Sequence, residues 1–384
     1  MHRWHSAIII LAALVYGVMC CYIFLAIEGR SERPTKVLHR SEVLSHSPPP
    51  FPFGEARSRD LALALRSPTH RRLTWTFQPW TLPLDGPSEL PYENDVSLRN
   101  ATHVVYGGGS GSVYLSSAPA EVLEGTSGLG NCGLDAARQM RRVAALDQGP
   151  AASSRAVVAL FDFVDAGYWG HAIENLWPRL APILRLGVDL TVVIPRTSIL
   201  SSHTSQLAEA LGLRIVRGTP PRSRRFLWMC DLPSYHPGLR SDFAAAARER
   251  LGIDHQRDEC TGVIFLSRAH GTAHGRNPRE AHRLEADLKE VGVDVLDDIG
   301  SITLRQLAGR IGHACGLAGA SGSALFHMTW LRPGSDVWVL FPRPSGTQYG
   351  YLWLHAHSLG HRYHHVLEPY SLIQRMAGLR NRSR

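Results

Sequence analysis

Short buried-strand segments alternate with helical segments from about residue 150 to the C-terminus, and no other feature restricts the fold as strongly. Runs of about four to eight Val, Ile, Leu and Phe residues predict strands that are covered on both faces. The first series comprises predicted strands at 156–163 and 191–195 and predicted helices at 170–186 and 201–211. Alternation of this kind indicates parallel sheets with helices on both faces.

A second series follows a break near 220–260. Its predicted strands are 262–267, 293–296, 316–318 and 337–341, and its predicted helices are 278–291, 303–314 and 323–331. Two such series predict an α/β protein with two Rossmann-like domains that face a cleft, one at 71–245 and one at 246–384. Ligands bind such sheets beyond the carboxyl ends of the strands, so the functional residues are expected there.

An uncharged apolar run, Ser6–Ile27, precedes this region. As a helix rising about 1.5 Å per residue, it covers the roughly 30 Å hydrocarbon core of a bilayer. The run is longer than the apolar part of a cleaved signal peptide. We therefore predict a cytosolic tail and transmembrane signal-anchor at 1–27 and a poorly ordered, proline-containing stem at 28–70.

Two features bear on the compartment of the remaining chain. Asn100 and Asn381 each begin an N-glycosylation tripeptide, which favours a luminal position for residues 28–384. Four cysteines lie beyond the span, namely Cys132, Cys230, Cys260 and Cys315. Their spacing contains no C-x-x-C pair, which argues against a zinc site, and it leaves disulfides and free buried thiols open.

The basic charge of the chain comes almost entirely from arginine. Lys and Arg number 41 against 33 Asp and Glu, the net charge is +8, and Lys36 and Lys289 are the only lysines. Because no lysine-rich tract exists, we expect no nucleic-acid partner. The arginine excess fits either a genome that favours Arg codons or an enzyme that binds phosphate through guanidinium groups.

A glycine run, Gly107–Gly111, separates two short β-prone segments. A phosphate-binding loop of this kind would lead directly into a helix, whereas an extended segment follows here. We therefore predict a hairpin loop.

The first candidate site segment is the start of the predicted helix at 170–186. His171, Glu174 and Asn175 fall within one helical turn, with Arg179 one turn further on. Burial of a histidine, a carboxylate and an arginine at the carboxyl end of a strand costs free energy, which favours a functional role for them. A purely structural role, in which His171 caps the helix, is the alternative.

The second segment ends the strand at 262–267. Arg268 follows that strand, and Arg276 and Asn277 lie just before the next predicted helix. Cations at a strand end and near a helix N-terminus suit a diphosphate. His270 and His274 lie in the same loop without a carboxylate nearby, so we assign no metal site.

The third segment is a glycine-rich turn that contains Ser321, Gly322 and Ser323 and joins a strand to a helix. Backbone N–H groups and the helix dipole in such a turn point toward an anion. The competing hypothesis is the nucleophile elbow of an α/β-hydrolase with Ser321 as nucleophile. The G-x-S-x-G pattern of that elbow fails at its last position, which is Ser323.

Together these segments resemble glycosyltransferase family 61 over about residues 150–365. His171–Leu180 (HAIENLWPRL) is similar to the family's H-W-L-x-D/E-x-L-P-R-L helix. Leu266–Arg268 with Arg276–Asn277 is similar to its I-S-R strand end and later R-N. Gly319–Pro342 (GASGSALFHMTWLRPGSDVWVLFP) follows the order and spacing of its G-P-H-G-A-G-L-T-N-x-x-F-x-x-P-G-S-x-V-I-E-L-F-P segment.

The resemblance implies a GT-B arrangement and a metal-independent, inverting hexosyl- or pentosyltransferase. Such an enzyme transfers xylose, arabinose or N-acetylglucosamine from a UDP-sugar to a glycan, a polysaccharide or a protein hydroxyl, without a separate cofactor. The resemblance further implies a single-pass type II protein of the Golgi or endoplasmic reticulum membrane. We assign catalysis to His171 and Glu174, and donor binding to Arg268, Arg276, Asn277, Ser321, Gly322 and Ser323.

Three positions depart from the family pattern. The family's glycine-turn His is Ser321 here, its later Asn is His327, and its helix carboxylate is Asn175, with Glu174 one position earlier. If the missing groups are needed for turnover, the chain is a weak or inactive member that binds a glycan or a nucleotide sugar. The Ser321 hydroxyl can still donate a hydrogen bond to phosphate.

The predicted topology has a direct test. Asn100 should carry a glycan, so glycosidase treatment should lower the apparent mass of the expressed protein, and Asn100→Gln should remove that decrease. Complete digestion of residues 28–384 by protease added outside sealed microsomes would contradict a luminal domain.

Overall fold

The computed structural model describes part of the chain. The described residues are 36–38, 53–66, 71–78, 80–83, 103–106, 109–116, 157–161, 166–218, 221, 223, 225–229, 232–234, 236–253, 260–267, 281–340, 350–366 and 368–382. The predicted membrane span lies outside them. No helix within these ranges combines the length and the apolar character that a membrane crossing requires.

A six-stranded sheet forms the N-terminal half, with the order β2-β5-β9-β6-β7-β8. Its strands are β2 (Arg71–Phe77), β5 (Gly109–Ser116), β6 (Val157–Leu160), β7 (Leu190–Ile194), β8 (Leu213–Arg217) and β9 (Phe226–Trp228). Only β5 runs antiparallel to its neighbours. The helices of this half are α2 (Phe53–Leu65), α5 (Trp169–His171), the π-helix η2 (Ala172–Leu176), α6 (Trp177–Leu184), α7 (Ser202–Ala210) and α8 (Pro237–Leu251).

A fully parallel five-stranded sheet forms the C-terminal half, with the order β11-β10-β12-β13-β14. Its strands are β10 (Val263–Leu266), β11 (Asp294–Leu296), β12 (Gly316–Ala320), β13 (Asp336–Leu340) and β14 (Arg362–Val366). Its helices are α9 (Ala281–Glu290), α10 (Leu304–Gly312), the 3₁₀-helix η3 (Ser323–Trp330), α11 (Gly350–Ser358) and α12 (Pro369–Arg382).

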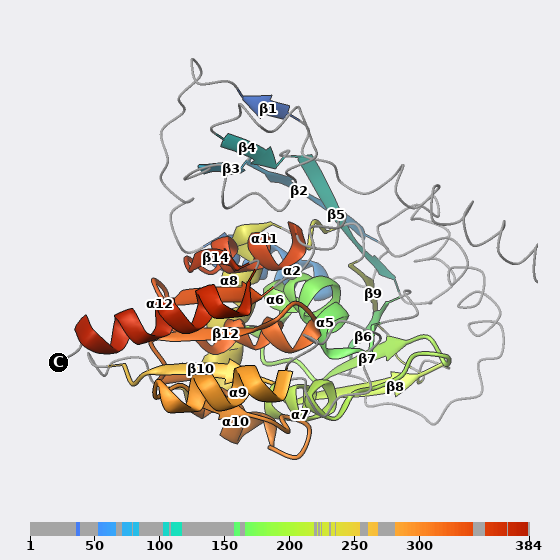
Figure 1. The fold of residues 1–384 in the computed structure, drawn as a ribbon. Coiled ribbons are helices and arrows are strands. Elements are labelled where there is room, and N and C mark those ends of the chain that lie inside the picture. The colour runs from blue at the N-terminus through green and yellow to red at the C-terminus, as the bar shows by residue number, and fades with distance from the viewer. Residues whose placement is uncertain are drawn as a thin grey trace, which may run out of the picture.

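A small antiparallel sheet combines β1 (Lys36–Leu38), β4 (His103–Tyr106) and β3 (Trp80–Pro83). In Figure 1, β2 and β5 extend from the six-stranded sheet toward this small sheet at the top of the view. The predicted α/β class with two sheets rich in parallel strands is confirmed, and this architecture is consistent with GT-B.

Local sequence explains where the main elements begin and end. The strands β6 (VVAL) and β7 (LTVVI) are buried at every position, as expected for strands covered on both faces. Helix α10 begins with a capping box in which Thr303 and Gln306 satisfy each other's backbone N–H groups. Helix α8 ends at Leu251 and is capped by Gly252, whose φ of 71° is the left-handed conformation that glycine adopts without a steric penalty.

One hydrophobic core spans both sheets. It runs from Leu61 of α2 through β6 and β7 to Val339 of β13 and Tyr363 of β14. Helix α8 contacts helices of both halves, and Arg248 on this helix donates hydrogen bonds to the carbonyls of Thr329 (2.8 Å) and Leu331 (2.6 Å). The predicted domain boundary at 245/246 lies inside α8, which joins the two halves.

Two predictions about the N-terminal part were wrong. The predicted stem contains α2, in which Leu61 is fully buried and Ser58 donates a hydrogen bond to the Pro182 carbonyl at 2.8 Å. The predicted hairpin loop at Gly107–Gly111 is in part a strand, because Gly109 and Gly111 pair with β2. Long-range contacts stabilise both features, and a local sequence pattern does not reveal them.

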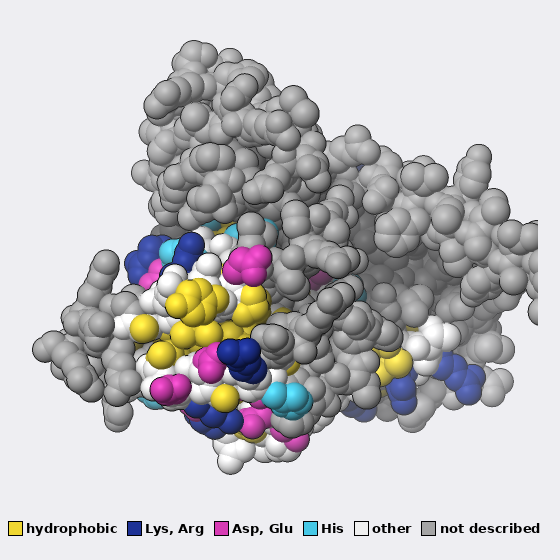
Figure 2. Space-filling model, viewed as in Figure 1, with side chains coloured by type: hydrophobic (Ala, Val, Ile, Leu, Met, Phe, Trp, Pro, Cys, Tyr) yellow, Lys and Arg dark blue, Asp and Glu magenta, His cyan; other side chains and the backbone are white. Residues whose placement is uncertain are grey.

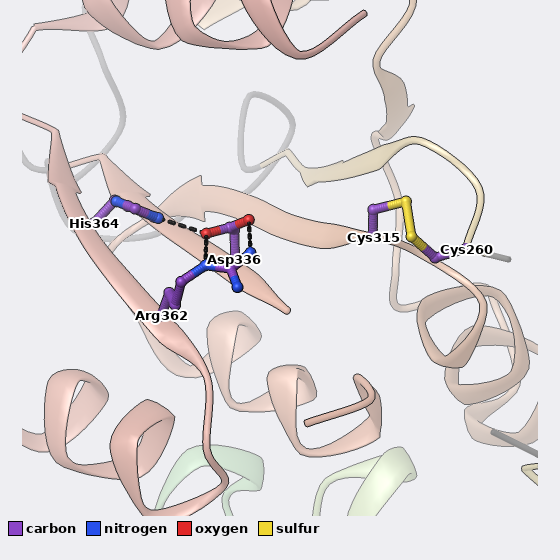
Figure 3. A network of polar contacts seen from close by, with 5 residues as sticks. All are labelled: Cys260, Cys315, Asp336, Arg362 and His364. Carbon is purple, nitrogen blue, oxygen red and sulfur yellow. Dashed lines mark hydrogen bonds and ion pairs between the residues drawn. A yellow bond between two sulfur atoms is a disulfide. The ribbon is translucent and has the colours of Figure 1, made fainter. Parts of the chain in front are cut away.

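A disulfide joins Cys260 to Cys315, just before β10 and β12 (Figure 3). The same strand starts are hydrogen-bonded, with the Cys315 N–H donating to the Gly262 carbonyl at 2.8 Å. A bridge across a sequence separation of 55 stabilises the fold by about 4 kcal/mol in the chain-entropy model. Cys132 and Cys230 lie outside the described residues.

A charged network lies at the amino ends of β13 and β14 (Figure 3). Arg362 donates two hydrogen bonds to the Asp336 carboxylate (2.8 and 2.6 Å), and His364 Nε2 lies 2.7 Å from Asp336 Oδ1. Burial by itself would raise the pKa of Asp336, but the hydrogen bonds and charges of His364 and Arg362 lower it to about 2. This end of the sheet is opposite to the strand ends where ligands bind.

Asp336→Asn should lower the free energy of unfolding at pH 7 by about 1–2 kcal/mol, a value reduced for partial solvent screening. Because the pKa of Asp336 in the folded protein lies below its ordinary value of 3.8, the carboxylate stabilises the fold above about pH 4 and loses this effect as the pH falls toward 2. Urea unfolding at pH 7 and pH 3 measures the decrease in the free energy of unfolding and its dependence on pH. Asp294→Asn, which breaks a half-exposed pair with Arg310, is the control with a smaller expected loss. An equal decrease in the free energy of unfolding of the two variants would contradict a stronger stabilising effect of Asp336.

Candidate active site

Each of the two large sheets has a topological switch point, where successive strand connections run to opposite sides. Predicted site residues follow a strand at both switch points. In the C-terminal sheet the chain leaves β10 toward β11 and returns past it to β12, so the switch lies between β10 and β12. In the N-terminal sheet the corresponding point lies between β6 and β9. Crevices at such points are the usual ligand sites of open α/β sheets.

His171 and Glu174 follow β6 at the switch point of the N-terminal sheet. The distance from His171 Nδ1 to Glu174 Oε2 is 3.7 Å, with the histidine side chain 53% exposed and the carboxylate side chain 7% exposed. Glu174 lies in the π-helix η2, a rare geometry that is frequent at functional sites. An exposed imidazole beside a buried carboxylate is suited to accept a proton from a substrate.

Hydrogen bonds of the Arg179 and Asn175 side chains stabilise this helical segment. Arg179 is 1% exposed and donates hydrogen bonds to the carbonyls of Leu232 (2.8 Å) and Asn175 (2.7 Å). The Asn175 side-chain oxygen accepts a hydrogen bond from the Ser234 hydroxyl at 3.2 Å. Because these two hydrogen bonds of the Arg179 guanidinium go to backbone carbonyls, this side chain supports the helical segment.

Ser321, Gly322 and Ser323 follow β12 at the switch point of the C-terminal sheet. The Ser321 N–H donates to the Leu340 carbonyl at 3.0 Å, which anchors the turn to β13. Ser321 is 8% exposed, and Ser323 is exposed at the first position of η3. The turn therefore presents a helix N-terminus and its partial positive charge at the carboxyl edge of the sheet.

The structure brings the first and third predicted segments into direct contact. A Cβ atom added to Gly170 would lie 2.8 Å from Ser323 Cβ and 3.2 Å from Ser323 Cα. A side chain at position 170 would therefore push α5 away from η3. The glycine allows the histidine turn of one sheet to lie against the serine turn of the other.

Aromatic rings fill the layer beneath this contact. The Trp169 ring stacks on His327, with centroids 4.4 Å apart, and His203 meets both rings edge-on. Trp330 Nε1 donates a hydrogen bond to His327 Nδ1 at 3.0 Å. Burial, and secondarily the proximity of His203, holds the pKa of His327 well below its usual range, so this imidazole is neutral. Sequence reasoning did not identify Trp169, His203 or Trp330 as parts of the junction.

The structure describes the second predicted segment only as far as Ser267. Ser267 is buried after β10, and its hydroxyl donates a hydrogen bond to the Glu285 carboxylate. Arg268, Arg276 and Asn277 lie outside the described residues and remain predictions. Among the described side chains, no group of three or more His, Cys, Asp or Glu could hold a metal ion.

Comparison with known proteins finds one family that this region resembles. Residues 169–338, from the Trp169 turn to β13, match the family model described as Glycosyltransferase 61. No curated protein matches the chain. The predicted resemblance to glycosyltransferase family 61 is therefore confirmed over residues 169–338. A match to this family supports an enzyme that uses a sugar donor and an acceptor.

The contact between the two turns leads to a prediction on stability. Gly170→Ala should lower the free energy of unfolding by about 1–3 kcal/mol, the usual cost of overpacking. Gly309→Ala in α10 is the matched control, because an added Cβ there meets nothing within 4 Å. We expect that variant to be more stable by about 0.5–1 kcal/mol. Thermal or urea unfolding measures both changes.

A second substitution tests the contact itself. Ser323→Gly removes the atom nearest to the added Cβ, so Gly170→Ala should cost less in the Ser323→Gly background. An identical cost in both backgrounds would show that the two turns do not touch.

Proposed function

We propose that the chain is a metal-independent, inverting glycosyltransferase that moves a sugar from a UDP-sugar to a hydroxyl of a glycan, polysaccharide or protein. The observation that carries this proposal is the contact between Gly170 and Ser323, which joins the ligand-binding edges of both sheets. An arrangement with donor and acceptor on opposite sides of such a junction fits two Rossmann-like domains of the GT-B type. The match to Glycosyltransferase 61 supports the reaction class.

The donor belongs to the C-terminal sheet in this proposal. The diphosphate binds the backbone N–H groups of Gly322 and Ser323 and the Ser321 hydroxyl at the start of η3. Arg268, Arg276 and Asn277, which follow β10 in the sequence, supply positive charge and further donors. These groups stabilise the negative charge that develops on UDP as it leaves.

The acceptor belongs to the N-terminal sheet. Its hydroxyl oxygen attacks the anomeric carbon, the bond from that carbon to the UDP oxygen breaks, and the hydroxyl proton passes to the His171 imidazole. Glu174, with its oxygen 3.7 Å from His171 Nδ1, orients the ring and stabilises the imidazolium that forms. If the proton passes directly to Glu174, His171 instead positions the acceptor.

A weak or inactive family member is the second candidate. The family's helix carboxylate is Asn175 here, and the Asn175 side-chain oxygen already accepts a hydrogen bond from Ser234. Such a protein would bind a nucleotide sugar or a glycan without turnover. The hydrolase hypothesis with Ser321 as nucleophile has less support, because the matched family transfers sugars.

We further propose a type II protein of the Golgi or endoplasmic reticulum membrane, anchored by residues 6–27. The apolar run and the glycosylation tripeptides support this position. The disulfide between Cys260 and Cys315 adds support, because such bonds persist in oxidising compartments.

The proposal is tested with the purified full-length protein and a panel of UDP-sugars, with UDP release as the readout. A donor that releases UDP in the presence of an acceptor supports a transferase. UDP binding by calorimetry without release from any donor supports the binding protein. An absence of UDP binding, together with labelling of Ser321 by an active-serine probe, would favour the hydrolase.

His171→Ala should lower turnover by about 10²–10⁴-fold, the usual contribution of a general base, and leave UDP affinity unchanged. His282→Ala, a substitution at an exposed position on α9, is the control that keeps wild-type turnover. The turnover of Glu174→Gln, measured in parallel, shows whether the acceptor proton passes to His171 or to Glu174. Near-normal turnover of the His171 variant would move the role of base to Glu174 or to another group.

A further inference from the structure

The carboxyl edge of the N-terminal sheet continues beyond His171 with exposed apolar side chains. Tyr168 and Ile199 are 40% and 56% exposed, and they are two of the four large hydrophobic residues that are exposed among the described residues. Tyr168 precedes α5 after β6, and Ile199 lies in the loop after β7. Exposed apolar side chains next to a reaction site indicate a binding surface.

The two loops that carry these side chains are held together. The Ser201 N–H donates a hydrogen bond to the Gly167 carbonyl at 2.9 Å. A Cβ atom added to Gly167 would lie 2.1 Å from the Ile199 carbonyl oxygen, so the two backbones are in contact. Tyr168 and Ile199 therefore keep a fixed position relative to each other.

Two exposed arginines, Arg196 after β7 and Arg217 at the end of β8, lie along the same edge of the sheet. Arg217 ends β8 and donates a hydrogen bond to the Ser198 carbonyl at 3.3 Å. The aliphatic part of Arg196 lies over Gly218, where an added Cβ would meet Arg196 Cβ at 3.4 Å. Within the described part of the chain, neither guanidinium forms an ion pair with a carboxylate. In Figure 2, basic side chains beside hydrophobic ones lie over the region of β7 and β8 at the right of the view.

We propose that Tyr168, Arg196, Ile199 and Arg217 form an acceptor strip that binds a saccharide acceptor with an anionic substituent. This inference rests on the proposed function and specifies the acceptor class. The apolar face of a sugar ring lies on Tyr168 and Ile199, near His171, and the anionic group binds the two arginines. Guanidinium groups suit carboxylate, sulfate and phosphate alike, so the shared chemistry is an anion on the saccharide.

The size and charge of the strip fit this ligand. From β6 to β8 the strip crosses two strand spacings, about 10 Å, which exceeds a single sugar ring. The acidic residues of the adjoining β7 and α7 segments, Asp189 and Glu209, lie at the opposite end of the strands, because α7 begins at the carboxyl edge and runs back from it. A neutral acceptor would leave both guanidinium groups without an anionic partner among the described residues.

The test measures binding of three oligosaccharides of equal length to the full-length protein by calorimetry. The probes are a sulfated heparin-derived saccharide, an oligogalacturonate and a neutral xylo-oligosaccharide. We expect at least one anionic probe to bind more tightly than the neutral one, with an affinity that falls as salt increases. Comparison of the sulfated probe with the carboxylated probe identifies which anion the strip prefers.

Two double variants separate the strip from the general basic charge of the chain. Arg196→Gln with Arg217→Gln should weaken binding of the anionic probe by about tenfold. Arg283→Gln with Arg375→Gln removes the same charge from exposed positions on α9 and α12 and should change it little. Tyr168→Ala should weaken binding of every probe that the strip holds, whereas Tyr168→Phe should retain it.

Equal losses in the two double variants, or equal affinity for neutral and anionic probes, would overturn the proposal. UDP affinity is measured in every variant as an independent readout, because the strip lies on the N-terminal sheet and the donor turn on the C-terminal sheet. Failure of the wild-type protein to bind UDP would contradict the proposed transferase. The binding of the anionic and neutral saccharides would still test the acceptor strip on its own.

Discussion

The close contact between Gly170 and Ser323 is the interaction on which the arrangement of this molecule depends. It places a turn of the N-terminal sheet against a turn of the C-terminal sheet, and the absence of a side chain at position 170 permits the approach. The stacked rings of Trp169 and His327 continue the contact into the core. The neutral state of His327 allows it to lie there without an opposing charge.

A buried polar network joins the same two halves on the far side of η3. Arg240 of α8 donates a hydrogen bond to His355 Nδ1 (3.0 Å), and His355 Nε2 lies 2.8 Å from the Thr329 hydroxyl. That hydroxyl donates to the Phe326 carbonyl, so it accepts from the imidazole, which carries its proton on Nε2. Burial and the charge of Arg240 hold the pKa of His355 well below its usual range, which agrees with this neutral tautomer. Arg248 adds hydrogen bonds to η3 from the same helix.

Elements with a strong periodic pattern could be predicted from the sequence, and elements fixed by distant contacts could not. The apolar runs of β6 and β7 and the capped helix α10 were found because their signals are local. Helix α2 was missed because its position depends on contacts such as Arg225 donating to the Leu65 carbonyl. Strand β8 (LRIVR) was missed because its polar ends conceal its apolar centre.

The candidate site shows the same division. The turns that carry His171 and Ser321 were recognised from their composition, but their contact across the molecule has no local signal in the sequence. The hydrophobic core that includes Leu61, Val192 and Leu317 spans both sheets, which has a consequence for how the chain loses its structure. Neither sheet can separate from the other without exposing apolar side chains of both, so the two halves unfold together as one cooperative unit. A fragment that ends within α8 would therefore be a poor substitute for either half, whichever ligand that half binds.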